Sequence, residues 1–338
     1  MDRCNLAVVG ATGAVGAAML EILEERDFPA DKVYALASER SAGKRVSFKG
    51  SQIIVGDLAS FDFSQVQIAL FSAGGSVSAE HAPRAAASGC VVIDNTSYFR
   101  RETDIPLVIP EVNAHRIADH LPRRIIANPN CSTIQMLVAL KPIHDAVGIT
   151  HIDVATYQAV SGAGMSAIEE LAGQTADILN AKPVRTKVFP RQIAFNALPH
   201  IGDFDEEGYT LEEKKMVWET HKIFEDDSIA VNPTCVRIPV FYGHSEAVHI
   251  RTKKPLSAAE ARVLLAAAPG VELMDDPGKK IYPVPAGDSS GTDPVYVGRI
   301  RENLFDNRGL NLWVVSDNVR KGAALNSIQI AELLIKSL

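Results

Sequence analysis

Three glycines near the start of the chain, Gly10, Gly13 and Gly16, restrict the fold more than any other feature of the sequence. They follow a short apolar run, residues 6–9, and precede residues 17–26, where apolar side chains recur at helical spacing. Glycines alone would also fit a plain strand-to-helix turn. In the first strand–turn–helix of a chain, however, they let the backbone approach a pyrophosphate at a helix N-terminus. The pattern therefore predicts a dinucleotide site.

The segments after this turn alternate between strand and helix patterns. Parallel-sheet connections produce such alternation, so the first 130 residues are expected to form a Rossmann-type domain with a doubly wound parallel sheet. The expected strands cover residues 33–37, 67–72, 90–94 and 125–127, and a helix is expected at 79–88.

The pattern changes at about residue 132. An apolar helix is expected at 134–146, and the chain of 338 residues exceeds the size at which one core stops growing. We therefore expect a second, α+β domain over 131–320 with a largely antiparallel sheet, while an amphipathic C-terminal helix at 323–338 joins the first domain as part of 321–338. The other expected strands are 152–160, 234–240, 247–252 and 312–315, and the other expected helices are 166–179, 211–224 and 258–268.

Composition excludes several classes of partner. The net charge of −7 gives no basic stripe for nucleic acid, although a local arginine pair could still bind a small anion. Residues 1–5 lack a secretory pattern, and no segment approaches the roughly 18 apolar residues of a membrane span. The four cysteines are scattered, which predicts no metal site and fits a reducing compartment. We expect a soluble cytoplasmic enzyme.

The end of the second expected strand bears on the choice of cofactor. Ser38, Arg40 and Ser41 offer donors suited to the 2′-phosphate of NADP. Glu39 is the alternative, because an acid near this position binds the 2′-hydroxyl of NAD. The nearby cations favour NADP.

Further cofactor contacts are expected where strands end. Open α/β sheets bind ligands at the carboxyl edge of their strands, which is where the third and fourth strands would place loops. A simple connection to the next helix is the alternative for the loop after the third strand. The candidates are Thr12, Ala14 and Val15 in the glycine turn, Ser72, Ala73 and Gly74 after the third strand, and Asn95 after the fourth.

Cys131 lies between the end of a strand and the start of an apolar helix. A helix N-terminus lowers a thiol pKa and supplies N–H groups to a developing oxyanion. Cys90 and Cys235 instead fall within expected strands, where a cysteine is usually structural. Its position favours Cys131 as a nucleophile.

Five motifs in order, with a match that extends to a segment near the C-terminus, give the sequence a specific resemblance. They are GATGAVG (10–16), NTSYFR (95–100), PNCST (129–133), QAVSGAG (158–164), RIPV-x₃-H (237–244) and SDNVRKGAALN (316–326). Together they resemble the bacterial aspartate-β-semialdehyde dehydrogenases over essentially the whole chain. The resemblance implies a second domain of the glyceraldehyde-3-phosphate dehydrogenase-like type. It also implies NADPH-dependent reductive dephosphorylation of aspartyl phosphate through a Cys131 thioester, in lysine (diaminopimelate), threonine and methionine biosynthesis.

The resemblance also assigns roles around the nucleophile. His244 matches the general acid/base, although a histidine beside a glycine is otherwise a turn residue. Gln158 matches the residue that orients the thioester. Arg237 matches the group that binds the substrate α-carboxylate, where a planar fork suits a bidentate contact; an ordinary ion-paired arginine is the alternative.

Phosphate, amine and nicotinamide contacts follow in the same way. Two assignments stay open by one position: Arg100 or Arg101 for the phosphate, and Glu212 or Glu213 for the substrate amine. The segment 211–215 is also typical of a solvated helix face. Asn130 and Lys215 match helpers of the phosphate-binding arginine, and Ser161, Gly162 and Asn318 match contacts to the nicotinamide.

Two related enzymes and a non-catalytic paralogue are the alternative functions. An N-acetylglutamyl-phosphate reductase shares the chemistry, and a glyceraldehyde-3-phosphate dehydrogenase would carry Ser-Cys-Thr-Thr where residues 130–133 read Asn-Cys-Ser-Thr. A non-catalytic paralogue would be expected to lose the nucleophile or its partners, all of which are present. The resemblance implies a homodimer, with a tetramer as the alternative.

Overall fold

The computed structural model of the protein describes residues 3–336. It divides into two compact units: one runs to Pro129 and includes the segment from Ala323 onward, and the other is Asn130–Gly322. Within residues 3–336, no helix has the length and apolar character that crossing a membrane requires.

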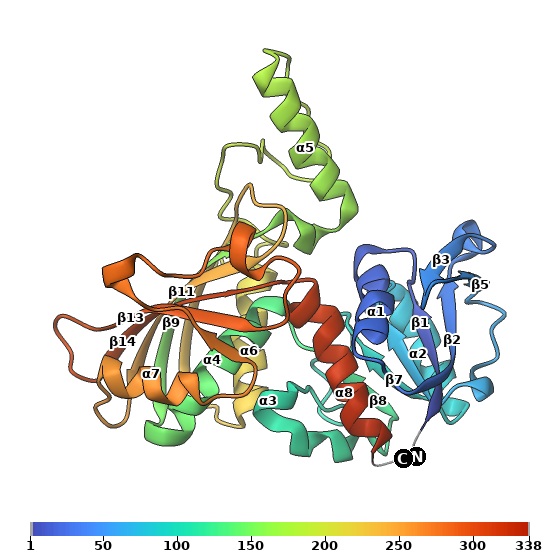
Figure 1. Ribbon diagram of the computed structural model, residues 1–338, viewed down its shortest axis with the longest axis horizontal. Coiled ribbons are helices and arrows are strands. Elements are labelled where there is room, and N and C mark those ends of the chain that lie inside the picture. Colours follow the sequence, from blue (N-terminus) through green and yellow to red (C-terminus); the bar gives the residue numbers. More distant parts are fainter. Residues whose placement is uncertain (1–2, 337–338) are drawn as a thin grey trace. The chain divides into compact units, whose positions relative to one another are not determined.

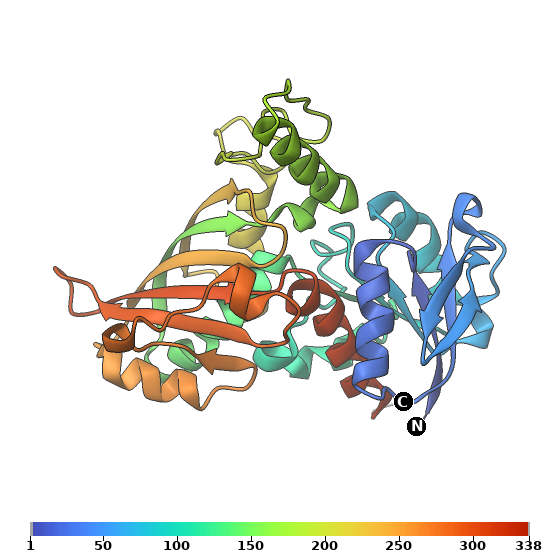
Figure 2. The same cartoon turned by 45° about the horizontal axis from the view of Figure 1, so that its top comes forward.

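The first unit contains a six-stranded sheet in the order β5-β2-β1-β6-β7-β8 (Figures 1 and 2). All its strand pairs are parallel, as the alternating sequence pattern predicted. The strands are β1 (Cys4–Val9), β2 (Ala30–Ala37), β5 (Gly56–Asp57), β6 (Ile68–Phe71), β7 (Val91–Asp94) and β8 (Ile125–Ala127). An antiparallel hairpin of β3 (Arg45–Phe48) and β4 (Ser51–Ile54), not expected from sequence, lies outside this sheet.

Helices cover this sheet through apolar faces. Met19 and Ile22 of α1 (Ala14–Glu25) are fully buried and share one core with Ile328 and Ala331 of α8 (Leu325–Ile335). The other α-helices in the described part of this unit are α2 (Gly75–Ala87) and the short α3 (Pro110–Asn113). The helix expected at 323–338 starts two residues later, after a single wide turn at Arg320–Ala324, and residues 337–338 lie outside the described part.

The second unit is built on a six-stranded mixed sheet in the order β10-β9-β11-β14-β13-β12. Two of its pairings, β9–β10 and β12–β13, are parallel, so the sheet is less antiparallel than the sequence suggested. The short β12 and the whole of β13 were not expected. The strands are β9 (Ile149–Gln158), β10 (Ala230–Arg237), β11 (His244–Thr252), β12 (Val271–Leu273), β13 (Val295–Glu302) and β14 (Gly309–Ser316).

Three helices, α4 (Cys131–Val147), α6 (Leu211–Phe224) and α7 (Ala258–Ala266), pack against this sheet. Figure 1 shows them on one face. Alternate residues of β9 and β11 are therefore buried, and polar side chains that point toward the helices are removed from water. Two strands end earlier than their sequence patterns suggested: β9 at Gln158 and β10 at Arg237, where turns begin.

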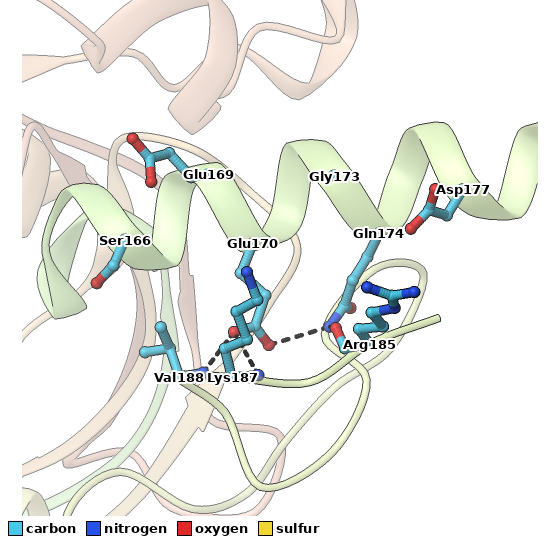
Figure 3. A pocket seen from close by; sticks show the side chains of 9 residues that line it. All are labelled: Ser166, Glu169, Glu170, Gly173, Gln174, Asp177, Arg185, Lys187 and Val188. Carbon is cyan, nitrogen blue, oxygen red and sulfur yellow. Dashed lines mark hydrogen bonds between the residues drawn. The ribbon is translucent and has the colours of Figure 1, made fainter. Parts of the chain in front are cut away.

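A fourth helix, α5 (Met165–Leu179), holds a long irregular loop against its side. Figure 3 shows Glu170 accepting hydrogen bonds from the backbone N–H groups of Lys187 and Val188. Gln174 likewise accepts from the N–H groups of Ile193 and Ala194. The hollow of about 250 Å³ beside these side chains therefore lies where the chain binds its own loop.

Candidate active site

The glycine turn of the first unit is dictated by close backbone contacts. Gly10 has φ of 87°, and a Cβ there would lie 2.6 Å from the carbonyl oxygen of Ser72. A Cβ on Gly16 would lie 2.1 Å from the carbonyl oxygen of Gly10. Gly13 is the N-cap of α1 and has no side chain, so the N–H groups of the first turn are not capped from there. The turn combines close backbone approach with a helix N-terminus, the arrangement that binds phosphate.

A cleft of about 480 Å³ opens beside this turn, within the first unit. The side chains of Ser38 and Arg40 in it are exposed, whereas Ser41 is buried. Asp57 and His81 also line the cleft and were not expected. Asp57 lies on β5, which is too short to be recognised in the sequence, and His81 lies on α2. Of the expected cofactor residues the cleft brings together Gly10, Thr12, Gly13, Ser38, Arg40, Ser41, Ser72 and Ala73, but not Ala14, Val15, Gly16, Gly74 or Asn95.

The loop after β7 holds Asn95 and Arg100. Asn95 donates to the carbonyl of Phe71 at 3.3 Å, and its carbonyl oxygen Oδ1 accepts from the hydroxyl of Ser327 at 3.0 Å. Arg100 donates from Nη2 to the backbone carbonyl of Asn95 at 2.9 Å and is buried, whereas Arg101 is exposed. The structure thus distinguishes the two arginines that the sequence left open.

In the second unit, Cys131 is the first residue of α4. The preceding Asn130 caps the helix: its Oδ1 accepts from the N–H groups of Ser132 at 3.0 Å and Thr133 at 3.2 Å. Cys131 is partly exposed, whereas Cys4, Cys90 and Cys235 are buried. Burial raises the pKa of Cys4 to about 11 and that of Cys90 to about 12. Cys131 is therefore the thiol most open to reagents.

Helix α6 supplies two buried carboxylates to the residue before this cysteine. Glu212 accepts from Asn130 Nδ2 at 2.7 Å, and Glu219 accepts from the Asn130 backbone N–H at 2.6 Å. Glu212 also accepts from Lys215 Nζ at 3.1 Å and from Gln158 Nε2 at 3.3 Å. The side chain of Asn130 therefore links the start of α4 to α6.

The two adjacent glutamates of α6 have different surroundings. Burial acts to raise the pKa of Glu212, but the charges of Lys215 and Arg237 help to hold it below its ordinary value, so the carboxylate is ionised. Glu213 instead forms a capping box with Thr210 and accepts from the N–H of Cys235 at 2.9 Å. Of this pair, only Glu212 is hydrogen-bonded to Asn130, Gln158 and Lys215, and these residues with Arg237 and His244 are called the polar cluster below.

Arg237, His244 and Gly162 form the other side of the cluster. Arg237 Nη1 donates to the carbonyl of Ala159 at 2.7 Å, and the N–H of the same residue donates to His244 Nδ1 at 3.0 Å. A Cβ on Gly162 would lie 2.9 Å from Arg237 Nη1 and 3.3 Å from His244 Nε2. Burial, reinforced by the charge of Arg237, lowers the pKa of His244 to about 3. Glycine at 162 keeps the space in front of both side chains open.

The expected nicotinamide contacts of this unit lie on the turns beside His244. Asn318 Oδ1 accepts from the Gly243 N–H at 2.9 Å, and its side chain is hydrogen-bonded to the hydroxyl of Ser161. A Cβ on Gly322 would lie 2.7 Å from the Cβ of Cys131, so a larger residue at position 322 would clash with the candidate nucleophile. The sequence analysis did not identify this glycine.

Sequence reasoning also missed a buried polar group beneath the cluster. Gln135, one helical turn after Cys131, donates to the backbone carbonyl of His244 at 3.4 Å and accepts from the Ser316 hydroxyl at 3.2 Å. Glu246 follows His244 by two residues on β11 and is fully buried. Its pKa is well above the ordinary value because of burial, an effect that Gln135 only partly offsets. The spacing i, i+4 from Cys131 was the available signal for Gln135.

Comparisons with known proteins agree with both units. Residues 5–120 match the family model described as "Semialdehyde dehydrogenase, NAD binding domain", and residues 140–321 match "Semialdehyde dehydrogenase, dimerisation domain". The chain is 62% identical over 330 residues to the aspartate-semialdehyde dehydrogenase of Legionella pneumophila, covering 98% of this chain and 95% of that protein.

Two solved structures extend the comparison. Aspartate semialdehyde dehydrogenase II of Vibrio cholerae, complexed with ASA, superposes with a TM-score of 0.97 at 58% identity, covering 99% of each chain. The Candida albicans enzyme with NADP gives 0.77 at 25% identity, covering 98% of each chain. The resemblance found in the sequence motifs is thereby confirmed. By full-length identity, by both domain models and by fold, this chain belongs to the aspartate-semialdehyde dehydrogenase family.

Proposed function

We propose that this protein reduces L-4-aspartyl phosphate to L-aspartate 4-semialdehyde and phosphate with NADPH, through a thioester on Cys131. One observation carries the proposal. A cysteine at a capped helix N-terminus lies in the same unit as two buried groups of opposite charge that act on each other electrostatically, the ionised carboxylate of Glu212 and the guanidinium of Arg237. The family places the reaction in the biosynthesis of lysine, threonine and methionine.

The charges of the polar cluster fit the amino-acid end of the substrate. Arg237 offers a planar fork for the α-carboxylate, and Glu212 offers a negative charge for the α-ammonium group. An N-acetylated substrate has no ammonium group to pair with Glu212. The polar cluster thus favours a free amino acid over the N-acetylglutamyl rival.

The chemistry begins at Cys131. Its thiolate attacks the acyl carbon, the S–C bond forms, and phosphate leaves with the electron pair of the broken C–O bond. Gln158 orients the resulting thioester, and His244 presents Nε2 to the carbonyl oxygen. Arg100 and Lys215 remain the proposed phosphate-binding groups.

The cleft beside the glycine turn fits a dinucleotide. Gly10 and Gly16 keep side-chain atoms out of the turn, and α1 presents its N-terminus. Arg40 lines the cleft and would contact a 2′-phosphate. NADPH bound there would supply the hydride that reduces the thioester. The Candida albicans structure with NADP supports the choice of cofactor.

We also propose a homodimer, with a tetramer as the alternative, since residues 140–321 match a dimerisation domain. Tyr157 and Trp313 are only partly buried on the sheet face that carries none of α4, α6 and α7, which makes this face the proposed contact. All four cysteines are thiols, which is consistent with a cytoplasmic location.

The test is the reverse reaction. Aspartate semialdehyde, phosphate and NADP should give absorbance at the reduced-nicotinamide band, and omission of phosphate should abolish it. Turnover of N-acetylglutamate semialdehyde, with no signal from aspartate semialdehyde, would overturn the proposal.

A further inference from the structure

Two consecutive polar residues near the start of α8, Asn326 and Ser327, are fully buried in a helix whose other buried side chains are apolar. We propose that both are positioning residues for the reaction. Ser327 holds the loop that carries Arg100, and Asn326 holds the chain that leads from β8 to Cys131. The inference rests on the proposed function, because it takes Arg100 as the group that binds phosphate.

The stability of α8 does not explain this polar pair. Asparagine and serine are poor helix formers, because their side chains compete for backbone hydrogen bonds, and burying a polar group costs free energy unless it is bonded. Apolar residues at both positions would extend the core that α8 shares with α1. Asn326 and Ser327 instead bond to residues 198 to 232 positions earlier in the chain. Their hydrogen bonds therefore hold specific distant segments.

These segments are the ends of two neighbouring strands. Asn95 is the first residue after β7, and Asn128 is the first residue after β8. The two strands pair in parallel with Asp94 opposite Ala127, and the Asn128 N–H donates to the carbonyl of Asp94 at 2.8 Å. Asn95 and Asn128 therefore leave the sheet side by side at its carboxyl edge, where open α/β sheets bind ligands. Helix α8 binds both.

Ser327 reaches Arg100 through Asn95. The carbonyl of Phe71 can only accept, and Asn95 Nδ2 donates to it at 3.3 Å, so the amide turns its Oδ1 toward Ser327. The Ser327 hydroxyl donates to this Oδ1 at 3.0 Å. The backbone carbonyl of Asn95 in turn accepts from Arg100 Nη2 at 2.9 Å. Because a guanidinium is planar, a bond at one nitrogen restricts the direction of the whole fork.

The same bonds give Asn95 a different role from the cofactor contact that the sequence suggested. Both ends of its amide are engaged within the first unit, and the cleft beside the glycine turn is lined by other residues. Asn95 therefore transmits the position of α8 to Arg100.

Asn326 holds the other strand end with both hydrogens of its amide. Its Nδ2 donates to Asn128 Oδ1 at 2.7 Å and to the carbonyl of Val108 at 3.0 Å. Two residues separate Asn128 from Cys131, so a shift of Asn128 would also move the nucleophile along the chain. A displacement of about 1 Å at a reacting group can cost roughly 100-fold in rate.

The test for Ser327 is the phosphate-dependent oxidation of aspartate semialdehyde by the full chain. S327A should raise KM for phosphate roughly threefold to tenfold, because a hydrogen bond that holds Asn95 is lost. KM for NADP and for aspartate semialdehyde should change less than about twofold. S88A is the control, since Ser88 bonds only the carbonyl of Arg84 at the end of α2. An equal rise in S88A, or none in S327A, would overturn the role of Ser327.

A double-mutant cycle shows whether Ser327 acts through Arg100. R100K should itself raise KM for phosphate, because lysine has no planar fork. Adding S327A to R100K should raise this KM by less than about twofold, since the residue that Ser327 positions is gone. Multiplicative effects would refute the inference alone. R100K with no effect on KM for phosphate would refute the phosphate role of Arg100 in the proposed function, and the inference with it.

Asn326 should give the opposite kinetic signature. N326A removes both donors from the end of β8, so kcat should fall roughly tenfold while KM for phosphate stays within about twofold of wild type. N128A removes the acceptor of the shorter bond and should behave alike, which keeps the test available where N326A does not fold. A cooperative urea transition and an unchanged NADPH affinity identify a folded variant. An unchanged kcat in the folded variants would overturn the role of Asn326.

Discussion

The two units present their candidate ligand groups in opposite ways. In the first unit the cleft is formed by backbone at Gly10 and Ser72 and by exposed side chains such as Arg40. In the second unit Arg237 is 5% exposed and His244 0%. Backbone and exposed groups bind without a large desolvation cost. Buried charges must be paired, so each depends on its neighbours. A single change is therefore expected to have a larger effect in the second unit.

The largest expected effect separates the two units. C131A should lower turnover by at least about 10⁴-fold, because the thioester cannot form, while NADPH affinity stays within about twofold. Stopped-flow single turnovers and fluorescence titration with NADPH measure the two quantities. Appreciable residual turnover would refute the covalent mechanism. Loss of NADPH binding would refute the idea that the first unit binds the nucleotide independently of Cys131.

Next in size is the buried cation. R237K should lower kcat/KM roughly 100-fold, because lysine cannot make a bidentate contact to a carboxylate and also keep the bond to the Ala159 carbonyl. R251K on β11 is the control, since Arg251 is half exposed and pairs with Asp306 at the surface. If the two substitutions had equal effects on kcat/KM in steady-state assays, Arg237 would have no specific role in substrate binding.

A pair of glycines tests crowding. G162A should lower kcat/KM roughly 10- to 50-fold, because the added methyl would lie 2.9 Å from Arg237 Nη1. G173A adds the same methyl in α5, where nothing lies within 4 Å, and should raise the free energy of unfolding by about 0.5–1 kcal/mol with activity retained. Urea denaturation and steady-state kinetics check both. Full activity in G162A would show that this space is not used.

The nucleotide unit should respond more mildly. R40A is expected to raise KM for NADPH roughly tenfold and leave KM for NADH nearly unchanged, because one charged contact to a 2′-phosphate is lost. R45A removes an exposed arginine of β3 outside the cleft and should change neither constant. An equal effect of R40A on both cofactors would argue for Glu39 and NAD.

The smallest effect on turnover is expected from a change that acts on stability alone. Because the folded-state pKa of Glu246 is raised above its unfolded value, its contribution is fully present below about pH 4.3 and is lost as pH rises toward the folded pKa. E246Q keeps a neutral side chain, so it should be the more stable protein above that pH. The gain should approach about tenfold in the unfolding constant per pH unit. Thermal melts at pH 5 and pH 8 with the same Tm difference would contradict this.

The sequence by itself determined the parallel sheet of the first unit, the glycine turn and the position of Cys131 at a helix start. These depend on spacing within a few residues, where local sterics and helix periodicity act directly. The order of the motifs along the chain also identified the family and indicated which polar residues to expect in the active site.

Tertiary structure alone separated Glu212 from Glu213 and Arg100 from Arg101, and it gave the Ala159 N–H its place against His244. Adjacent residues of like chemistry differ only in what the fold packs against them. Burial and charge come from elements more than 50 residues away in the chain, such as β9 against α6. Desolvation and pairing, which fix ionisation and tautomer, are therefore properties of the packed molecule.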